Sequence, residues 1–198
     1  MANYRNNRVL PTILVVVIVI IAIVALFSIA RAIFFPGTST STTDTTEQAL
    51  LNTSADSSVS MSVRGPIVAD ENFHSYRINV SPSSRQLTTY NGYMGTVVEQ
   101  KNLGNNTAAY TEFVNALNLA KMTAGNQPPE GASNVQGICA TGRLTEYSIL
   151  NDNYTLETLW TSTCSGSQGT LRANSKQLSN LFLNQIPDAN DLIKNVSL

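Results

Sequence analysis

Residues 73–92, with the sequence FHSYRINVSPSSRQLTTYNG, decide the fold of the larger part of this chain. Tyr76, Ile78 and Val80 alternate with polar residues, which is the period of a half-buried β-strand. A Ser-Pro-Ser-Ser turn signal follows, and a second strand then runs to an Asn-Gly turn. The stretch therefore predicts an antiparallel β-hairpin.

The segments on either side of this hairpin extend it into a larger sheet. Residues 59–64 alternate between apolar side chains and serine or arginine, as a strand does, before a Gly-Pro pair interrupts the pattern. Residues 96–100 indicate a further short strand. Residues 105–122 are the clearest helix, because apolar residues recur at helical spacing and Asn106 or Thr107 can cap its start.

The second half of the chain repeats this plan in outline. Residues 137–150 and 154–164 predict two strands around a turn, and Ser175 caps a helix that Pro187 ends. We therefore predict an α+β domain, in which an antiparallel sheet carries about two helices on one face in a tandem ββα arrangement. Because identity between the halves is slight, chance repetition of hairpins is the alternative interpretation.

Cys139 and Cys164 are the only cysteines, and both follow the first hairpin. They fall at the outer ends of the second predicted hairpin, so paired strands would bring them opposite one another and allow a disulfide bond. Two reduced, buried thiols are the alternative. Two thiols and the single histidine, His74, are too few for a tetrahedral zinc site, and we expect no metal and no cofactor.

An apolar run at residues 9–35 sets the first part of the chain apart. About twenty such residues span a hydrocarbon core of ~30 Å as a helix, so we predict a single-pass transmembrane helix that contacts the lipid bilayer. Arg5 and Arg8 precede the run, and Arg31, near its C-terminal end, is the only other basic residue close to it. The positive-inside rule then predicts a plasma (cytoplasmic) membrane location with the N-terminus inside and the C-terminal domain outside.

A signal peptide cleaved after Ala30 is the alternative interpretation of this run, although its apolar core would be about twice the usual length. Residues 36–58 are rich in serine and threonine and predict a flexible stalk. These boundaries leave residues 1–8 as a cytoplasmic tail and residues 59–198 as an extracytoplasmic α+β domain.

Composition excludes one class of partner. The formal net charge is −1 and charged residues make up 13% of the chain, whereas nucleic acid requires clustered lysine and arginine. Asn-x-Ser/Thr sequons are glycan acceptors on exported domains of eukaryotes, although chance also explains them in this chain. They begin at Asn52, Asn79, Asn105, Asn153 and Asn195.

Candidate catalytic residues are few. His74 beside Asp70 and Glu71 has the residue types of a general base with carboxylate helpers, but a lone histidine on a strand is more often structural. No serine lies in a Gly-x-Ser-x-Gly context. We therefore predict no catalytic residue and no enzyme.

Aromatic residues are better candidates for a binding surface. An aromatic sheet face opposite the helices would bind a glycan, a peptide or a partner protein, while packing in the core is the competing interpretation. The candidates are Tyr90, Tyr93, Tyr147, Tyr154 and Trp160.

Together these patterns favour a membrane-anchored, extracytoplasmic, non-enzymatic domain that binds a ligand or partner at the cell surface. The first alternative is a structural or assembly component of an envelope complex, in which the apolar run itself makes the contacts. The second, less favoured, is a hydrolase of exported substrates that depends on His74.

Overall fold

The computed structural model describes residues 13–14, 42–126, 134–194 and 196. The chain divides into two compact units, Met1–Thr42 and Thr43–Leu198, and all the strands belong to the second unit. Within the described residues, no helix is both long enough and apolar enough to cross a membrane. The transmembrane helix predicted for residues 9–35 lies outside them, apart from Ile13 and Leu14.

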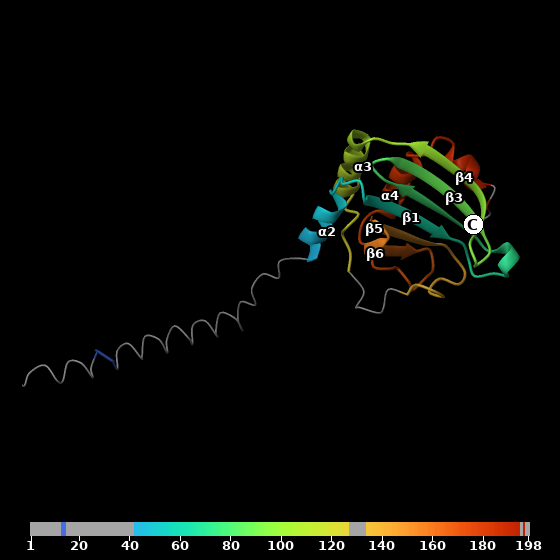
Figure 1. Cartoon of the computed structure of the whole chain (residues 1–198). Coiled ribbons are helices and arrows are strands. Elements are labelled where there is room, and N and C mark those ends of the chain that lie inside the picture. The colour runs from blue at the N-terminus through green and yellow to red at the C-terminus, as the bar shows by residue number, and fades with distance from the viewer. Residues whose placement is uncertain (1–12, 15–41, 127–133, 195, 197–198) are drawn as a thin grey trace, which may run out of the picture. The chain divides into compact units, whose positions relative to one another are not determined.

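The helices and strands of the second unit are, in chain order, α2 (Thr42–Leu50), β1 (Ser57–Arg64), the 3-10 helix η1 (Asp70–Asn72), β2 (His74–Val80), β3 (Ser84–Asn91), β4 (Thr96–Gly104), α3 (Thr107–Leu119), β5 (Leu144–Asn151), β6 (Tyr154–Ser162), α4 (Ser175–Leu183) and α5 (Ala189–Lys194). Figure 1 labels most of the helices and strands that follow α2 in the chain, and α2 itself.

The six strands form one antiparallel sheet in the order β4-β3-β2-β1-β5-β6 (Figure 1). β1 to β4 form a meander, and the chain then returns through α3 so that β5 pairs with the free edge of β1. This confirms the predicted α+β domain with an antiparallel sheet. The halves are not two equal ββα units, because four strands precede α3 and only two lie between α3 and α4.

The hairpin predicted from residues 73–92 is present as β2 and β3. Its turn is closed by the Ser81 N–H, which donates to the Ser84 carbonyl at 2.8 Å. The register places Ile78 opposite Met61 of β1 and Leu87 of β3. Alternate residues of neighbouring strands therefore point to the same face of the sheet.

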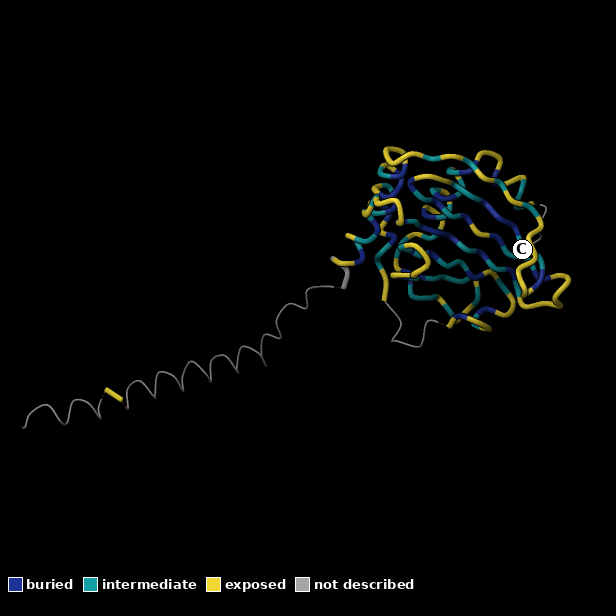
Figure 2. Tube along the Cα trace, viewed as in Figure 1, coloured by how far each residue is buried: buried dark blue, intermediate teal, exposed yellow. Residues whose placement is uncertain are grey.

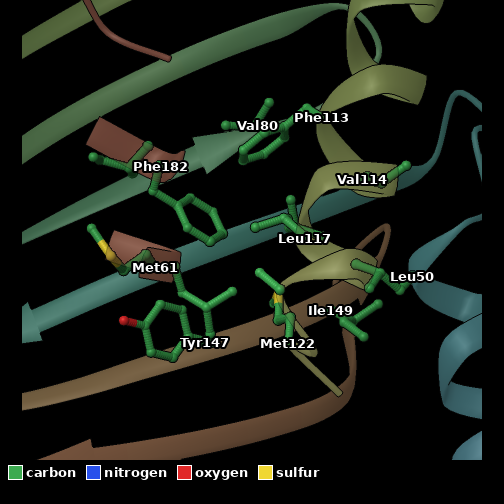
Figure 3. Packing of buried hydrophobic residues seen from close by; sticks show 14 of the residues in the cluster. Leu50, Met61, Val80, Phe113, Val114, Leu117, Met122, Tyr147, Ile149 and Phe182 are labelled. Atoms are coloured by element: carbon green, nitrogen blue, oxygen red, sulfur yellow. The ribbon is translucent and has the colours of Figure 1, made fainter. Parts of the chain in front are cut away.

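The main hydrophobic core lies between one face of the sheet and the helices, and we call this the covered face (Figure 3). Leu117 of α3, Phe182 of α4 and Met61 of β1 have no exposed surface. The Phe182 ring meets Phe113 edge to face, with 5.3 Å between ring centroids. In Figure 2 the buried residues follow the strands and the helix faces that meet them, whereas exposed residues gather in the loops.

Asparagine side chains cap α3 and α4. Asn106 accepts a hydrogen bond from the Ala109 N–H at 2.9 Å, as one of the two caps predicted for this helix. Asn174, and not the predicted Ser175, caps α4 by accepting from the Gln177 N–H at 3.1 Å. α4 therefore begins at the residue that the sequence suggested as its cap.

The folded unit begins earlier than the sequence suggested. The predicted stalk at residues 36–58 includes α2, whose Leu50 is fully buried in the main core. Asn118 Nδ2 of α3 also donates to Glu47 Oε1 of α2 at 2.6 Å. A helix this short is marginal in isolation, and packing against α3 and the sheet provides the stability that its sequence lacks.

The predicted disulfide between Cys139 and Cys164 is present, with a Cα–Cα distance of 5.5 Å. The strands are shorter than predicted, since β5 begins at Leu144 and β6 ends at Ser162. Both cysteines therefore lie in the loops beyond the paired strands. The bond joins the segment before β5 to the segment after β6.

Candidate binding groove on the open sheet face

The face of the sheet opposite the helices is polar, and we call it the open face. Because side chains alternate along a strand, the neighbours of the core residues point to this side. Most carry hydroxyl, amide, carboxylate or guanidinium groups. They are Ser60, Ser62 and Arg64 of β1, Ser75, Arg77 and Asn79 of β2, Thr88 and Tyr90 of β3, Glu146 and Ser148 of β5, and Thr158 and Trp160 of β6.

Two adjoining pockets form a groove on the open face. The first has a volume of about 490 Å³ and lies over β1, β2 and β3, where polar side chains predominate. The second, of about 360 Å³, lies between the β1–β2 loop and the β3–β4 turn and is more apolar. We call the two together the open-face groove. They share Arg64, Ser75, Gly95, Val135 and Gln136.

Three charged side chains line the first pocket. Arg64 Nη2 of β1 lies 3.4 Å from Glu146 Oε2 of β5, and these side chains are 29% and 22% exposed. Arg77 of β2 donates from Nε to Ser62 Oγ at 2.8 Å. Two arginines against one glutamate leave this pocket with a surplus of one positive charge.

Much of the hydrogen-bonding capacity of the two arginines is unused. A guanidinium group carries five N–H donors. Among the residues that the structure describes, buried Arg64 Nε has no acceptor, and the two terminal nitrogens of Arg77 have none either. Because Arg77 is exposed, its terminal N–H groups can exchange water for an anionic acceptor, which makes a charge-assisted hydrogen bond.

The β3–β4 turn forms one wall of the groove. The Tyr93 ring stacks on Phe73 with 4.1 Å between centroids, and its hydroxyl donates to the Val68 carbonyl at 2.7 Å. The Tyr93 N–H donates to Asp70 Oδ1 at 2.7 Å. Gly92, with φ of 73°, brings the turn so close to Asp70 that a Cβ there would lie 3.0 Å from its carboxylate. The turn is thus fixed against η1.

The loop before β5 forms the opposite wall. Val135, Cys139 and Leu144 make a second buried cluster, with the partly buried Trp160 packed against it. The disulfide ties this loop to the segment after β6. The indole ring of the open face is therefore covered by the loop, and the groove runs between this loop and the β3–β4 turn.

Of the five aromatic candidates, Tyr90 and Tyr93 line the groove. Trp160 lies beside it through its contacts with the second cluster. Tyr154 is 76% exposed at the start of β6 and does not line the groove. The structure therefore brings two of the five together and places a third behind the wall.

Tyr147 does not belong to the open face, and its proposed place on a binding surface is corrected. It is 1% exposed in the main core, because it lies one position beyond Glu146 and so points to the covered face. Its hydroxyl donates to the Ser175 carbonyl at 2.9 Å and lies 2.8 Å from Ser179 Oγ. Burial raises the pKa of this phenol.

His74 and its supposed helpers are not arranged for catalysis. His74 Nδ1 is buried and has no hydrogen-bond partner among the described residues. Asp70 instead accepts from the Tyr93 N–H, and Glu71 is exposed. In the part of the chain that the structure describes, no three His, Cys, Asp or Glu side chains lie close enough to hold a metal ion.

Arg64, Arg77 and Glu146 were not among the site residues predicted from the sequence. Both arginines occupy the polar positions of alternating strands, so part of the signal was present. Glu146 reaches them through the pairing of β1 with β5, whose residues are far apart in the sequence. Only this non-local pairing assembles the charged pocket.

Comparison with other proteins does not assign this chain to a family. No protein-family model matches the sequence, and no curated protein matches it significantly.

Proposed function

We propose that this chain is a membrane-anchored, extracytoplasmic domain that binds a ligand or partner through the open-face groove. The observation that carries the proposal is the groove itself, with its unpaired arginine donors on the face opposite the helices. Binding is favoured over catalysis because the groove gathers arginines, serines, tyrosines and one glutamate. Within the described residues, it pairs no nucleophile with a general base.

The location rests on the sequence and on the disulfide. Residues 9–35 have the length and composition of a single-pass helix, with the basic residues biased to its N-terminal side. A disulfide is typical of compartments outside the reducing cytoplasm. We therefore place the folded unit on the outer side of the plasma (cytoplasmic) membrane.

Thiol labelling of intact cells tests this location. The chain has only two cysteines and both are in the disulfide, so a membrane-impermeant maleimide should label it only after an impermeant reductant. Labelling that requires cell lysis as well as reduction would place the domain inside and remove the proposed location.

Site-specific photo-crosslinking in the native host tests the binding role. A benzophenone amino acid at Gln136, an exposed residue of the groove, should form a discrete covalent adduct. The matched position is Leu119, which is 82% exposed on α3, and it should form none. Adducts of equal yield from both positions, or none from Gln136, would contradict a binding role for the groove.

A further inference from the structure

We propose, resting on the binding function above, that the open-face groove takes an organic monocarboxylate with an apolar or aromatic body. Its carboxylate would bind Arg64 and Arg77 in the first pocket. Its body would lie in the second pocket against Phe73 and Tyr93. The two pockets adjoin, so one small molecule can occupy both.

The positions of the two arginines suit a single carboxylate. Arg77 pairs with Ser62 across the strands, and Arg64 pairs with Ser75, so the arginines are diagonal neighbours about 7–8 Å apart at the backbone. Their long side chains can therefore converge on one group. A guanidinium fork matches a planar carboxylate in two parallel hydrogen bonds, a geometry that a lysine cannot offer.

The charge of the pocket favours a monoanion. Glu146 already offsets one of the two arginines at 3.4 Å, which leaves one positive charge for a ligand. A single carboxylate neutralises that charge. A phosphate dianion would leave a negative surplus beside Glu146 and would be repelled by it.

The second pocket supplies the apolar contacts. It borders directly on Arg64 and Ser75, so an apolar group attached near the carboxylate reaches it without a long spacer. Tyr93, which stacks on the buried Phe73 and is 50% exposed, offers flat aromatic surface on one side. The apolar residues of the loop wall lie on the other side, and they are Val135, Ile138 and Leu144.

Comparing phenylacetate with its neutral amide, phenylacetamide, tests the binding of the carboxylate separately from the packing of the apolar body. The full-length chain in detergent micelles is titrated with each at millimolar concentrations, as suits so small a ligand. Trp160 is the only tryptophan and packs against the groove wall, so its fluorescence reports binding. Saturation-transfer NMR of the probe protons gives a second readout. Phenylacetate should bind at least about tenfold more tightly than phenylacetamide.

Arg77→Gln should weaken phenylacetate binding by about tenfold and leave phenylacetamide unchanged, because it removes one charged donor. Arg77→Lys should recover part of the loss. Lys176→Gln is the matched control, since this cation is exposed on α4 and does not line the groove, and it should change nothing. The arginine variants alter a surface side chain, and circular dichroism confirms that they fold.

Equal affinity for the acid and the amide would overturn the carboxylate assignment, and so would inorganic phosphate binding as tightly as phenylacetate. Absence of phenylacetate binding would overturn it as well. If Gln136 still gives its crosslinked adduct in that case, the groove remains a binding surface for a ligand of other chemistry. If phenylacetate does not bind and Gln136 gives no crosslinked adduct, both the proposed function and this inference are contradicted.

Discussion

The covered and open faces of the sheet are formed by alternate residues of the same strands. They differ in how far their side chains are packed or hydrogen-bonded within the protein. On β1, Met61 and Val63 are at most 5% exposed and pack among the helices. Ser62 and Arg64 alternate with them and line the groove. The covered face is filled by the chain's own side chains, whereas the open face keeps unused donors. Stability and recognition should therefore respond to different substitutions.

The largest expected effect comes from opening the core of the covered face. Leu117 is fully buried, and Leu119 on the same helix is 82% exposed. Leu117→Ala should lower the free energy of unfolding by about 2–5 kcal/mol through lost burial and a cavity. Leu119→Ala should change it by less than about 0.5 kcal/mol. Urea unfolding of the full-length chain, followed by near-UV circular dichroism, measures both, and similar losses would contradict the comparison.

A similar or slightly smaller effect is expected from the disulfide, which holds one wall of the open-face groove. Replacing both Cys139 and Cys164 by serine should lower the free energy of unfolding by about 3 kcal/mol, because the bond closes a loop of 25 residues in the unfolded chain. Reductant should bring the wild type to the stability of this double variant and leave the variant unchanged. A wild-type urea midpoint that does not move on reduction is the contrary result.

Alkaline pH should weaken the covered face selectively. Burial raises the pKa of the Tyr76 phenol from 10.0 to about 12. The unfolded chain loses this proton near pH 10 and the folded chain holds it to about pH 12. The contribution of Tyr76 to the free energy of unfolding is therefore fully present below pH 10. It falls by about 3 kcal/mol as the pH rises to about 12.

Two tyrosine variants isolate this contribution. Tyr76→Phe should make the fall in urea midpoint between about pH 10 and 12 shallower without abolishing it, because a phenylalanine has no proton to lose, whereas burial also raises the pKa of Tyr110 and Tyr147. Tyr154→Phe is the matched control, at a residue that is 76% exposed, and should leave the slope as in the wild type. Equal slopes in all three proteins would show that other groups control the alkaline transition.

Local patterns predicted most of the covered face. The alternation of Tyr76, Ile78 and Val80 predicted a strand, and the asparagine before residues 107–119 predicted a helix start, because both signals depend on neighbours in the sequence. The segment of α2 was predicted as part of a flexible stalk, because it is too short to be a stable helix alone and its stability comes from tertiary packing through Leu50.

The candidate site was harder to predict for the same physical reason. The aromatic hypothesis named Tyr90 and Tyr93, which line the groove, but it also included Tyr147, whose face depends on strand register. A one-residue difference in where β5 pairs with β1 would exchange Tyr147 and Glu146 between the faces. Composition could not reveal that a chain of net charge −1 gathers two arginines in one pocket.

The smallest expected effect concerns the ion pair of the open face. Arg64 and Glu146 lie 3.4 Å apart at partial exposure, and such pairs usually contribute about 0–1 kcal/mol. A double-mutant cycle of Arg64→Gln and Glu146→Gln should give a coupling of less than about 1 kcal/mol in the free energy of unfolding. Urea unfolding of the two single variants and their combination measures it.

The same variants should behave differently when phenylacetate binding is measured. Glu146→Gln raises the surplus charge of the pocket and releases Arg64 for the ligand, so binding should tighten, whereas Arg64→Gln should weaken it. A coupling well above about 1 kcal/mol in unfolding would instead mean that the pair is part of the structural framework. Opposite shifts in phenylacetate affinity with little change in the free energy of unfolding would show that these two charges contribute to ligand binding and not to the stability of the fold.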